Sequence, residues 1–214
     1  MDTVRVITKI EELDKKRSKI YINQKFEFVL YKGEVVQYKL KTDKTIENSI
    51  YFEITKRILP QRAKKRCLNL LQKRPYTECK LREKLKEGFY SQEIIEEAVG
   101  YVKSFHYIDD YDYACQYIFY HKDSESKRKM EEKLSLKGIS KEILSKAFSD
   151  SYLNEEEIQE LELKQAVKLL EKRKYNAEIM DRQEKQKIYA FLVRKGINAS
   201  IIKKAMMMQD DIAE

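Results

Sequence analysis

The sequence predicts a mainly α-helical protein, in which a small N-terminal antiparallel β element precedes three tandem three-helix repeats that form an elongated array. Three observations support this prediction. The 214 residues include 5 Gly and 2 Pro, which is too few for a loop-rich sandwich or barrel. The spacing of hydrophobic residues is helical from Asn48 onward. One sequence pattern occurs three times within that helical part, as in repeat architectures.

The first 55 residues have the alternating pattern of β-strands. Apolar residues alternate with polar ones on both sides of Gly33, which predicts a hairpin that turns at this glycine. They are Phe26, Phe28 and Leu30 before the turn, and Val36, Tyr38 and Leu40 after it. So small a sheet has too little core to stand alone, and we expect it to pack on the helix that follows.

The repeated pattern lies at residues 80–99, 129–148 and 187–206. Each copy begins with two apolar residues, four positions apart, that mark the buried face of one helix. These pairs are Leu81 and Leu85, Met130 and Leu134, and Ile188 and Leu192. A second helix follows in each copy, and a further helix precedes it. The pattern predicts a β element at 1–55 and three-helix units at 56–108, 109–160 and 161–214, which stack to bury their apolar faces.

Each copy also carries capping signals at the turn between its two helices. Gly138 and Gly196 follow the first helix, where a left-handed cap favours glycine. In the first copy the glycine is displaced to Gly88, so we expect a different turn there. A side chain that can accept hydrogen bonds from the opening N–H groups precedes the second helix. These predicted N-caps are Ser91, Ser140 and Asn198.

Composition and charge exclude several classes of function. The chain has three cysteines and no CxxC pair, which predicts reduced thiols in a cytoplasmic protein. Neither a phosphate-binding glycine motif nor a metal-ligand spacing occurs, so we expect no enzyme, no cofactor and no metal ion. No apolar run is long enough to span a membrane, and the N-terminus lacks the apolar core of a secretory signal. The net charge of +8 indicates contact with a polyanion or with a protein surface of mixed charge.

Four segments together resemble the RecX family, whose members are bacterial regulators of the RecA recombinase. The first, 71–78, contains Arg74 and Thr77 in an Arg-x-x-Ser/Thr motif before a helix. The other three are the acidic linker at 107–114, the glycine turn at 137–139 and the segment FLVRKGI at 191–197. The chain departs from the family pattern at Lys80, at 124–129, and at Lys195 and Ile197.

The resemblance implies a non-enzymatic regulator that lies along the groove of a RecA filament on single-stranded DNA. We expect a monomer, because an array of three repeats needs no second copy to be stable. Such a regulator would block filament growth or promote disassembly, and so lower ATP hydrolysis, strand exchange and the SOS response. Stacked repeats suit this task because they present a long continuous surface. Two alternatives remain open from the residues alone: a helical-repeat protein that binds single- or double-stranded DNA directly, and a helical adaptor for another protein.

Basic clusters are the candidate contacts with the partner or with DNA. Lys127, Arg128 and Lys129 are favoured, because cations at the start of a helix gain nothing from the helix dipole. For the pair at 73–74 and the run at 172–174, stabilisation of a helix C-terminus is an alternative explanation. The remaining candidates are Arg62, Lys65, Arg66, Lys73, Arg74, Lys172, Arg173, Lys174, Arg194 and Lys195.

Two further features have a structural and a functional interpretation. Of the pair Asp109 and Asp110, we expect Asp110 to cap the helix that begins near Tyr111, rather than to bind a metal or transfer a proton. Tyrosines are frequent between 101 and 120, where they would fill gaps between helices or stack on bases. We expect the packing role.

Overall fold

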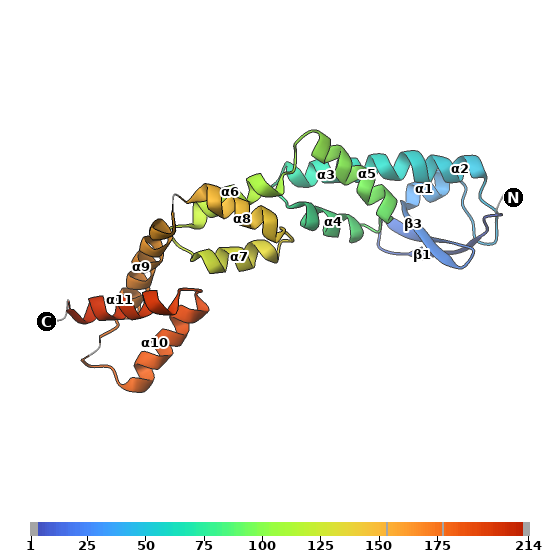
Figure 1. The fold of residues 1–214 in the computed structure, drawn as a ribbon. Coiled ribbons are helices and arrows are strands. Elements are labelled where there is room, and N and C mark those ends of the chain that lie inside the picture. The colour runs from blue at the N-terminus through green and yellow to red at the C-terminus, as the bar shows by residue number, and fades with distance from the viewer. Residues whose placement is uncertain (1–3, 153, 177, 212–214) are drawn as a thin grey trace. The chain divides into compact units, whose positions relative to one another are not determined.

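The computed structural model describes residues 4–152, 154–176 and 178–211, and the chain divides into two compact units, 1–108 and 109–214. The N-terminal unit contains an antiparallel sheet of β1 (Ile7–Glu12), β2 (Arg17–Ile22) and β3 (Lys25–Tyr31), in that order (Figure 1). Asn23 and Gln24 join β2 to β3 in a two-residue turn, and both have positive φ, 49° and 68°. The predicted small antiparallel β element is confirmed.

The hairpin predicted at Gly33 is wrong. Residues Lys32–Gln37 form the short helix α1, and the Glu34 carboxylate accepts a hydrogen bond from the Tyr31 backbone N–H at 2.8 Å. The alternation of apolar residues after Gly33 is therefore not that of a strand. Leu40 is buried in the core of this unit without belonging to the sheet.

The helical part begins at the predicted residue. In the N-terminal unit, α2 (Asn48–Phe52) continues through the π-helical segment η1 (Glu53–Ile58) into α3 (Leu59–Leu71). The helices α4 (Glu78–Lys86) and α5 (Gln92–Ser104) follow and complete the first repeat. α3 packs against α5, and both contribute to one core with the sheet.

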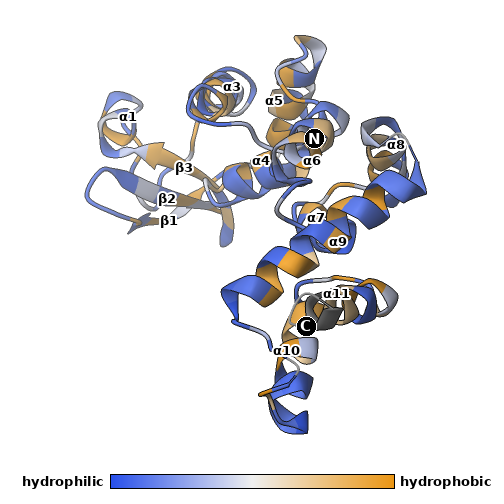
Figure 2. Cartoon of the chain, turned by 90° about the vertical axis from the view of Figure 1, so that its left-hand side faces the viewer, coloured by the Kyte–Doolittle hydropathy of each residue, from blue (hydrophilic) through white to orange (hydrophobic). Residues whose placement is uncertain are grey.

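The second unit holds two repeats. The second repeat consists of α6 (Asp110–His121), α7 (Lys127–Ser135) and α8 (Lys141–Ser151). The third consists of α9 (Glu155–Lys172), α10 (Arg182–Arg194) and α11 (Ala199–Asp211). In each repeat the first helix packs on the third, as α3 does on α5. Helices such as α9 carry both hydrophobic and hydrophilic residues, as Figure 2 shows.

Five of the six predicted core positions are fully buried. Leu81, Leu85, Met130, Leu134 and Leu192 have no exposed surface, whereas Ile188 is partly exposed. Three alanines at one place in the third helix of each repeat, Ala98, Ala147 and Ala205, are fully buried as well. An alanine at this place allows the first and third helices of a repeat to approach closely. The three-helix repeats are thus confirmed, and their cores follow the spacing in the sequence.

The caps also follow the pattern, with one exception in position. Ser91 and Ser140 accept hydrogen bonds from the backbone N–H groups of Ile94 and Ile143, each at 3.4 Å. The helix α6, however, is capped by Asp109, which accepts from the N–H groups of Tyr111 and Asp112 at 2.8 and 3.1 Å. Asp110, the predicted cap, is the first residue inside the helix, because the helix begins one residue earlier than expected.

The left-handed residues of the three turns differ in kind. Gly138 and Gly196 have φ of 85° and 86°, as predicted for the C-terminal caps of α7 and α10. The same place in the first repeat is occupied by Phe89, with φ of 64°. A residue with a side chain is strained at this φ, whereas glycine is not. The first turn therefore differs from the other two, as its displaced glycine predicts.

Candidate partner-binding surface

The start of α7 is joined directly to the turn between α10 and α11. Ser126, which is 1% exposed, accepts a hydrogen bond from the Lys129 N–H at 3.3 Å as the cap of α7. Its hydroxyl also donates to the carbonyl oxygen of Lys195 at 2.9 Å. One serine therefore holds the basic residues at 127–129 beside those at 194–195.

The close approach of these segments depends on a glycine. A Cβ added at Gly196 would lie 2.5 Å from Ser126 Oγ, closer than real Cβ contacts come, and 3.2 Å from Lys129 N, which is tighter than most. Any other residue would require either the Ser126 side chain or the α10–α11 turn to shift. Gly196 thus serves both the left-handed turn and the contact between the second and third repeats.

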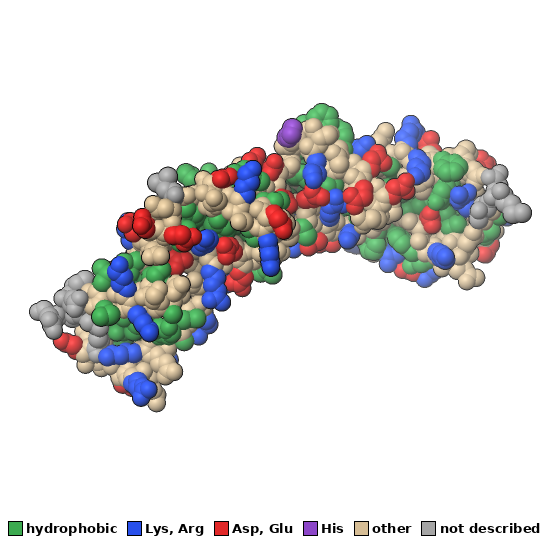
Figure 3. Space-filling view, viewed as in Figure 1, with side chains coloured by type: hydrophobic (Ala, Val, Ile, Leu, Met, Phe, Trp, Pro, Cys, Tyr) green, Lys and Arg blue, Asp and Glu red, His purple; other side chains and the backbone are tan. Residues whose placement is uncertain are grey.

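A third basic segment reaches the same turn through an aromatic ring. The guanidinium of Arg173 lies 4.2 Å from the centre of the Phe191 ring, and Lys195 Nζ lies 5.6 Å from it. Both are cation–π distances, and both side chains are exposed. We call Arg128, Lys129, Arg173, Arg194 and Lys195 the composite basic surface. Figure 3 shows Lys and Arg side chains gathered over the third repeat.

Acidic residues lie among these cations. Lys127 Nζ is 3.6 Å from Glu155 Oε1, and Lys129 Nζ is 2.7 Å from Glu132 Oε2. The hydrogen bond and charge of Lys129 hold the pKa of the Glu132 carboxyl below its usual value. Arg128 is exposed and makes no ion pair with any described residue. The surface is therefore positive with acidic neighbours, rather than uniformly basic.

Two buried polar residues of α9 fix the third repeat on the second. Gln165 Nε2 donates to the carbonyl oxygens of Lys122 and Glu125, at 2.7 and 3.3 Å, beyond the end of α6. Glu162, 7% exposed, accepts from the Asn198 N–H at 3.5 Å. Burial raises the pKa of Glu162, while the N–H groups of Asn198 and Lys127 oppose that rise. Sequence reasoning missed both residues, because a buried Glu or Gln has no distinguishing spacing on a helix.

The other predicted candidates lie elsewhere. In the N-terminal unit, Lys65 and Arg66 are exposed on α3, while Arg62 is paired with Glu34. Lys73 and Arg74 follow α3, and Arg74 lies 4.8 Å from the centre of the Tyr76 ring. Lys172 and Lys174 are exposed at the end of α9, on either side of Arg173. The structure therefore brings the clusters at 127–129, 173 and 194–195 together, and it leaves 62–74 in the other unit.

The tyrosines between 101 and 120 divide between packing and exposure. Tyr111, Tyr113 and Tyr117 pack on the core of the second repeat, as expected for residues that fill gaps between helices. Tyr107 and Tyr120, in contrast, are 54% and 75% exposed. Within the residues that the structure describes, no group of three or more His, Cys, Asp or Glu side chains is placed to hold a metal ion. None of the described helices is long and apolar enough to cross a membrane.

Residues 63–101 match the first three-helix domain of RecX, and residues 160–206 match the third. These two segments are similar to RecX domains. The matched segments lie in the first and third repeats, and the composite basic surface includes residues from the third RecX domain.

Relatives named regulatory protein RecX match most of the chain. The protein of Bacillus licheniformis is 26% identical over 95% of this chain and 77% of its own length. That of Clostridium perfringens strain SM101 is 28% identical over 88% of both chains. That of Caldanaerobacter subterraneus subsp. tengcongensis is 27% identical over 94% of this chain and 98% of its own. The chain is thus similar to RecX-family regulators over nearly its full length.

Solved RecX structures have the same fold. One, described as a crystal structure of regulatory protein RecX, has a TM-score of 0.60 and 25% identity and covers 94% of this chain and 99% of its own. RecX from Lactobacillus salivarius has a TM-score of 0.57 and 21% identity over 71% of this chain and 96% of its own. The second comparison concerns the fold alone.

Proposed function

We propose that this protein is a non-enzymatic regulator of the RecX family that binds the RecA filament on single-stranded DNA and inhibits its extension, ATP hydrolysis and strand exchange. It would thereby modulate homologous recombination, DNA repair and the SOS response in the cytoplasm, acting as a monomer. The observation that carries the proposal is the composite basic surface, which the start of α7 builds together with two segments of the third RecX domain.

The charges around this surface favour a protein partner over bare DNA. Glu132 and Glu155 lie within 4 Å of Lys129 and Lys127, so acidic and basic groups alternate at the start of α7. A partner of mixed charge can meet both signs, whereas a phosphate backbone would be repelled by the carboxylates. Arg128 is the residue of the favoured cluster that is available to an acidic group of the partner.

The test is ATP hydrolysis by the cognate RecA on single-stranded DNA, with this protein titrated from trace amounts to equimolar. Loss of hydrolysis at amounts well below one protein per recombinase monomer is expected if the protein acts at filament ends. Unchanged hydrolysis at equimolar protein, with filaments still visible by electron microscopy, would refute the proposal.

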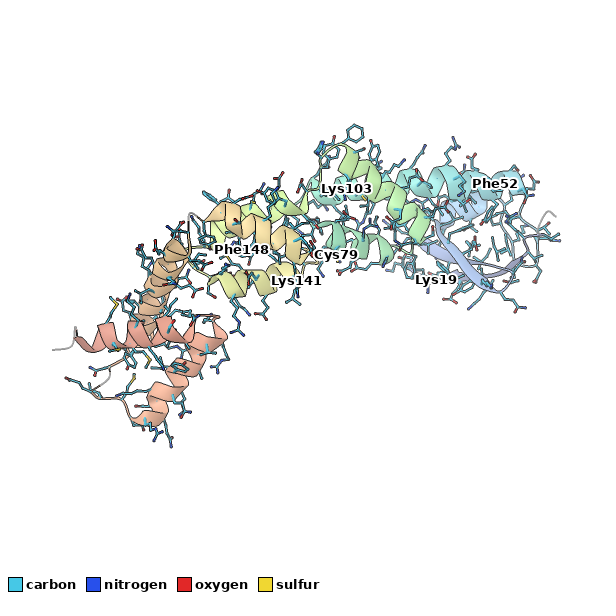
Figure 4. The ribbon with its side chains drawn as sticks, in the orientation of Figure 1. Lys19, Phe52, Cys79, Lys103, Lys141 and Phe148 are labelled. Atoms are coloured by element: carbon cyan, nitrogen blue, oxygen red, sulfur yellow. The ribbon has the colours of Figure 1, made fainter. Side chains whose placement is uncertain are left out.

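Charge reversal then tests the surface itself. Arg128→Glu with Arg194→Glu is expected to weaken inhibition several-fold, because both changes place a negative charge on the composite basic surface. Lys141→Glu with Lys146→Glu is the matched control, since it makes the same change of charge at two exposed cations of α8 outside this surface. Lys141 is labelled in Figure 4. Equal loss in the double variant and in the control would assign the effect to net charge alone.

Direct DNA binding is the second candidate, and the exposed Arg128, Arg173 and Arg194 support it. Binding of single-stranded DNA without RecA should then weaken steeply with salt, by roughly 0.7 in log K per log unit of salt for each phosphate contacted. Absent or salt-independent binding would rule this candidate out and leave the protein-partner proposal standing.

A further inference from the structure

A cation-lined cavity of about 450 Å³ lies within the N-terminal unit. Its walls come from the turn between β1 and β2, from β3, from α3, and from the turn between α4 and α5. The side chains that matter to its chemistry are Lys16, Arg17, Tyr31, Arg62, Arg66 and Tyr90. The cavity lies between the sheet, which precedes the matched segment 63–101, and residues of that segment such as Arg66 and Tyr90.

Three of the five basic residues that line the cavity form ion pairs, and within the described part of the chain the other two do not. Arg17 pairs with Asp14 at 2.8 Å, and Arg62 pairs with Glu34. At the rim, Lys84 and Glu87 pair at 2.6 Å. Asp14 and Glu87, the acidic residues of the lining, are therefore each neutralised.

Lys16 and Arg66, by contrast, are exposed and make no ion pair with any described residue. Two positive charges at one cavity, with the acids already paired, favour an anionic ligand. Arginine in particular suits phosphate, because its planar guanidinium donates two parallel hydrogen bonds.

The cavity also presents aromatic surface. The Arg62 guanidinium lies 4.6 Å from the centre of the Tyr31 ring. Tyr90 is partly buried, and among the described residues its hydroxyl has no hydrogen-bond partner. Burial raises the pKa of that hydroxyl, and the charges of Arg62 and Arg66 partly offset the rise. A half-buried tyrosine hydroxyl usually finds a partner, so this one is free to meet a ligand.

The turn that carries Tyr90 has an unusual construction. A Cβ at Gly88 would lie 2.8 Å from Tyr90 Cε2, so the ring occupies space that only a glycine leaves open. Phe89, in the left-handed region, places its ring 6.1 Å from that of Phe26 on β3 and 5.2 Å from Lys19 Nζ. A strained residue thus fixes this turn against the sheet and holds one wall of the cavity in place.

We propose that this cavity binds a nucleotide unit, with its phosphate at Lys16 and Arg66 and its base against the rings of Tyr31 and Tyr90. The volume is in the range of small-ligand sites. Stacking of a base on an aromatic ring beside cations is the usual way in which single nucleotides are held without sequence preference. The nucleotide is either free or part of a single strand, and the inference is independent of RecA.

The test measures binding by fluorescence anisotropy with two probes, a 3′-labelled oligothymidylate with a 5′-phosphate and a ribose-labelled adenosine triphosphate. The variant is Lys16→Glu with Arg66→Glu. Its matched control is Lys15→Glu with Lys65→Glu, which makes the same change of charge at the adjacent exposed residues that do not line the cavity. Thermal unfolding of both variants checks that the unit is folded.

The cavity variant should bind the preferred probe roughly tenfold more weakly than the control, since it loses two charge-assisted contacts. Tighter binding of the oligonucleotide would show that the cavity binds a nucleotide within a single strand, and tighter binding of the mononucleotide would show that it binds a free nucleotide. Equal weakening by the variant and its control, or binding of neither probe at about 0.1 M salt, would overturn the proposal.

A second pair of variants leaves the charge unchanged. Tyr90→Leu should weaken binding several-fold, because it removes the ring face and the hydroxyl. Tyr107→Leu, at an exposed tyrosine of the same unit outside the cavity, should leave binding unaltered. Full binding by Tyr90→Leu would contradict the stacking of a base at this ring.

Discussion

The hydroxyl of Ser126 donates a hydrogen bond to the carbonyl oxygen of Lys195, 69 positions further along the chain, at 2.9 Å. The same oxygen atom of Ser126 caps α7. A single buried side chain therefore caps the start of one helix and fixes the turn between two others.

Ser126→Ala should destabilise the second unit by about 2 kcal/mol, from a lost cap and a lost buried hydrogen bond. Ser140→Ala removes the cap of α8, which is exposed, and should cost about 1 kcal/mol. Chemical denaturation of both variants measures the difference. Equal losses would show that the bond to Lys195 contributes no stability.

Gly196→Ala should destabilise the protein by about 3 kcal/mol, because it combines a left-handed φ with a Cβ that collides with Ser126 Oγ. The cost should fall when the same change is made in the Ser126→Ala background, since the hydroxyl is then absent. A double-mutant cycle measures this coupling. Purely additive effects would mean that the collision is relieved by movement of the turn.

Glu162→Gln should change how stability depends on pH. In the unfolded chain Glu162 has the ordinary pKa of 4.5, and burial in the folded protein raises that pKa. The backbone N–H groups of Asn198 and Lys127 and the charge of Lys127 lower the pKa in part, whereas the charge of Glu131 raises it further. The folded state therefore holds the proton more tightly, so this residue's contribution to stability is present below pH 4.5 and is lost as the pH rises through the raised pKa.

The glutamine variant should accordingly match the parent protein in acid and equal or exceed its melting temperature at neutral pH. Glutamine can still accept from the Asn198 N–H without carrying a buried charge. Melting curves between about pH 4 and pH 8 test this. A variant that melts well below the parent at neutral pH would show that the ionised carboxylate is stabilising.

Phe89→Gly has two opposing effects on stability, the relief of backbone strain and the loss of side-chain packing. Glycine relieves the left-handed conformation, worth about 1 kcal/mol, but removes the contact of the ring with Phe26 and part of its buried surface, worth about 2 kcal/mol. We expect a net loss of about 1 kcal/mol in the free energy of unfolding. Hydrogen exchange should show the loss mainly in β3, and a more stable variant would mean that strain dominates.

Much of the helical architecture could be predicted because its signals are local. The pairs Leu81 and Leu85, and Met130 and Leu134, mark buried faces by spacing alone, and Gly138 marks a turn by its conformational freedom. The hairpin failed because the true turn, Asn23 and Gln24, contains no glycine, while Gly33 lies in a helix where its freedom is not used.

The candidate site could be predicted only in part. The sequence identifies Lys127, Arg128 and Lys129 as cations at the start of a helix, and the structure confirms that position. It does not indicate that Arg173 and Lys195 share the ring of Phe191, because that contact depends on how α9 packs on α10. Nor does it reveal Gln165, whose acceptors are backbone atoms of the preceding repeat.

The hydrogen bonds of Gln165 also set an order of events during synthesis. The carbonyl oxygens of Lys122 and Glu125 lie between α6 and α7 and leave the ribosome before α9 does, in a repeat that has a hydrophobic core of its own. When α9 emerges, the acceptors of Gln165 are already present in the folded second repeat, and the third repeat packs onto it.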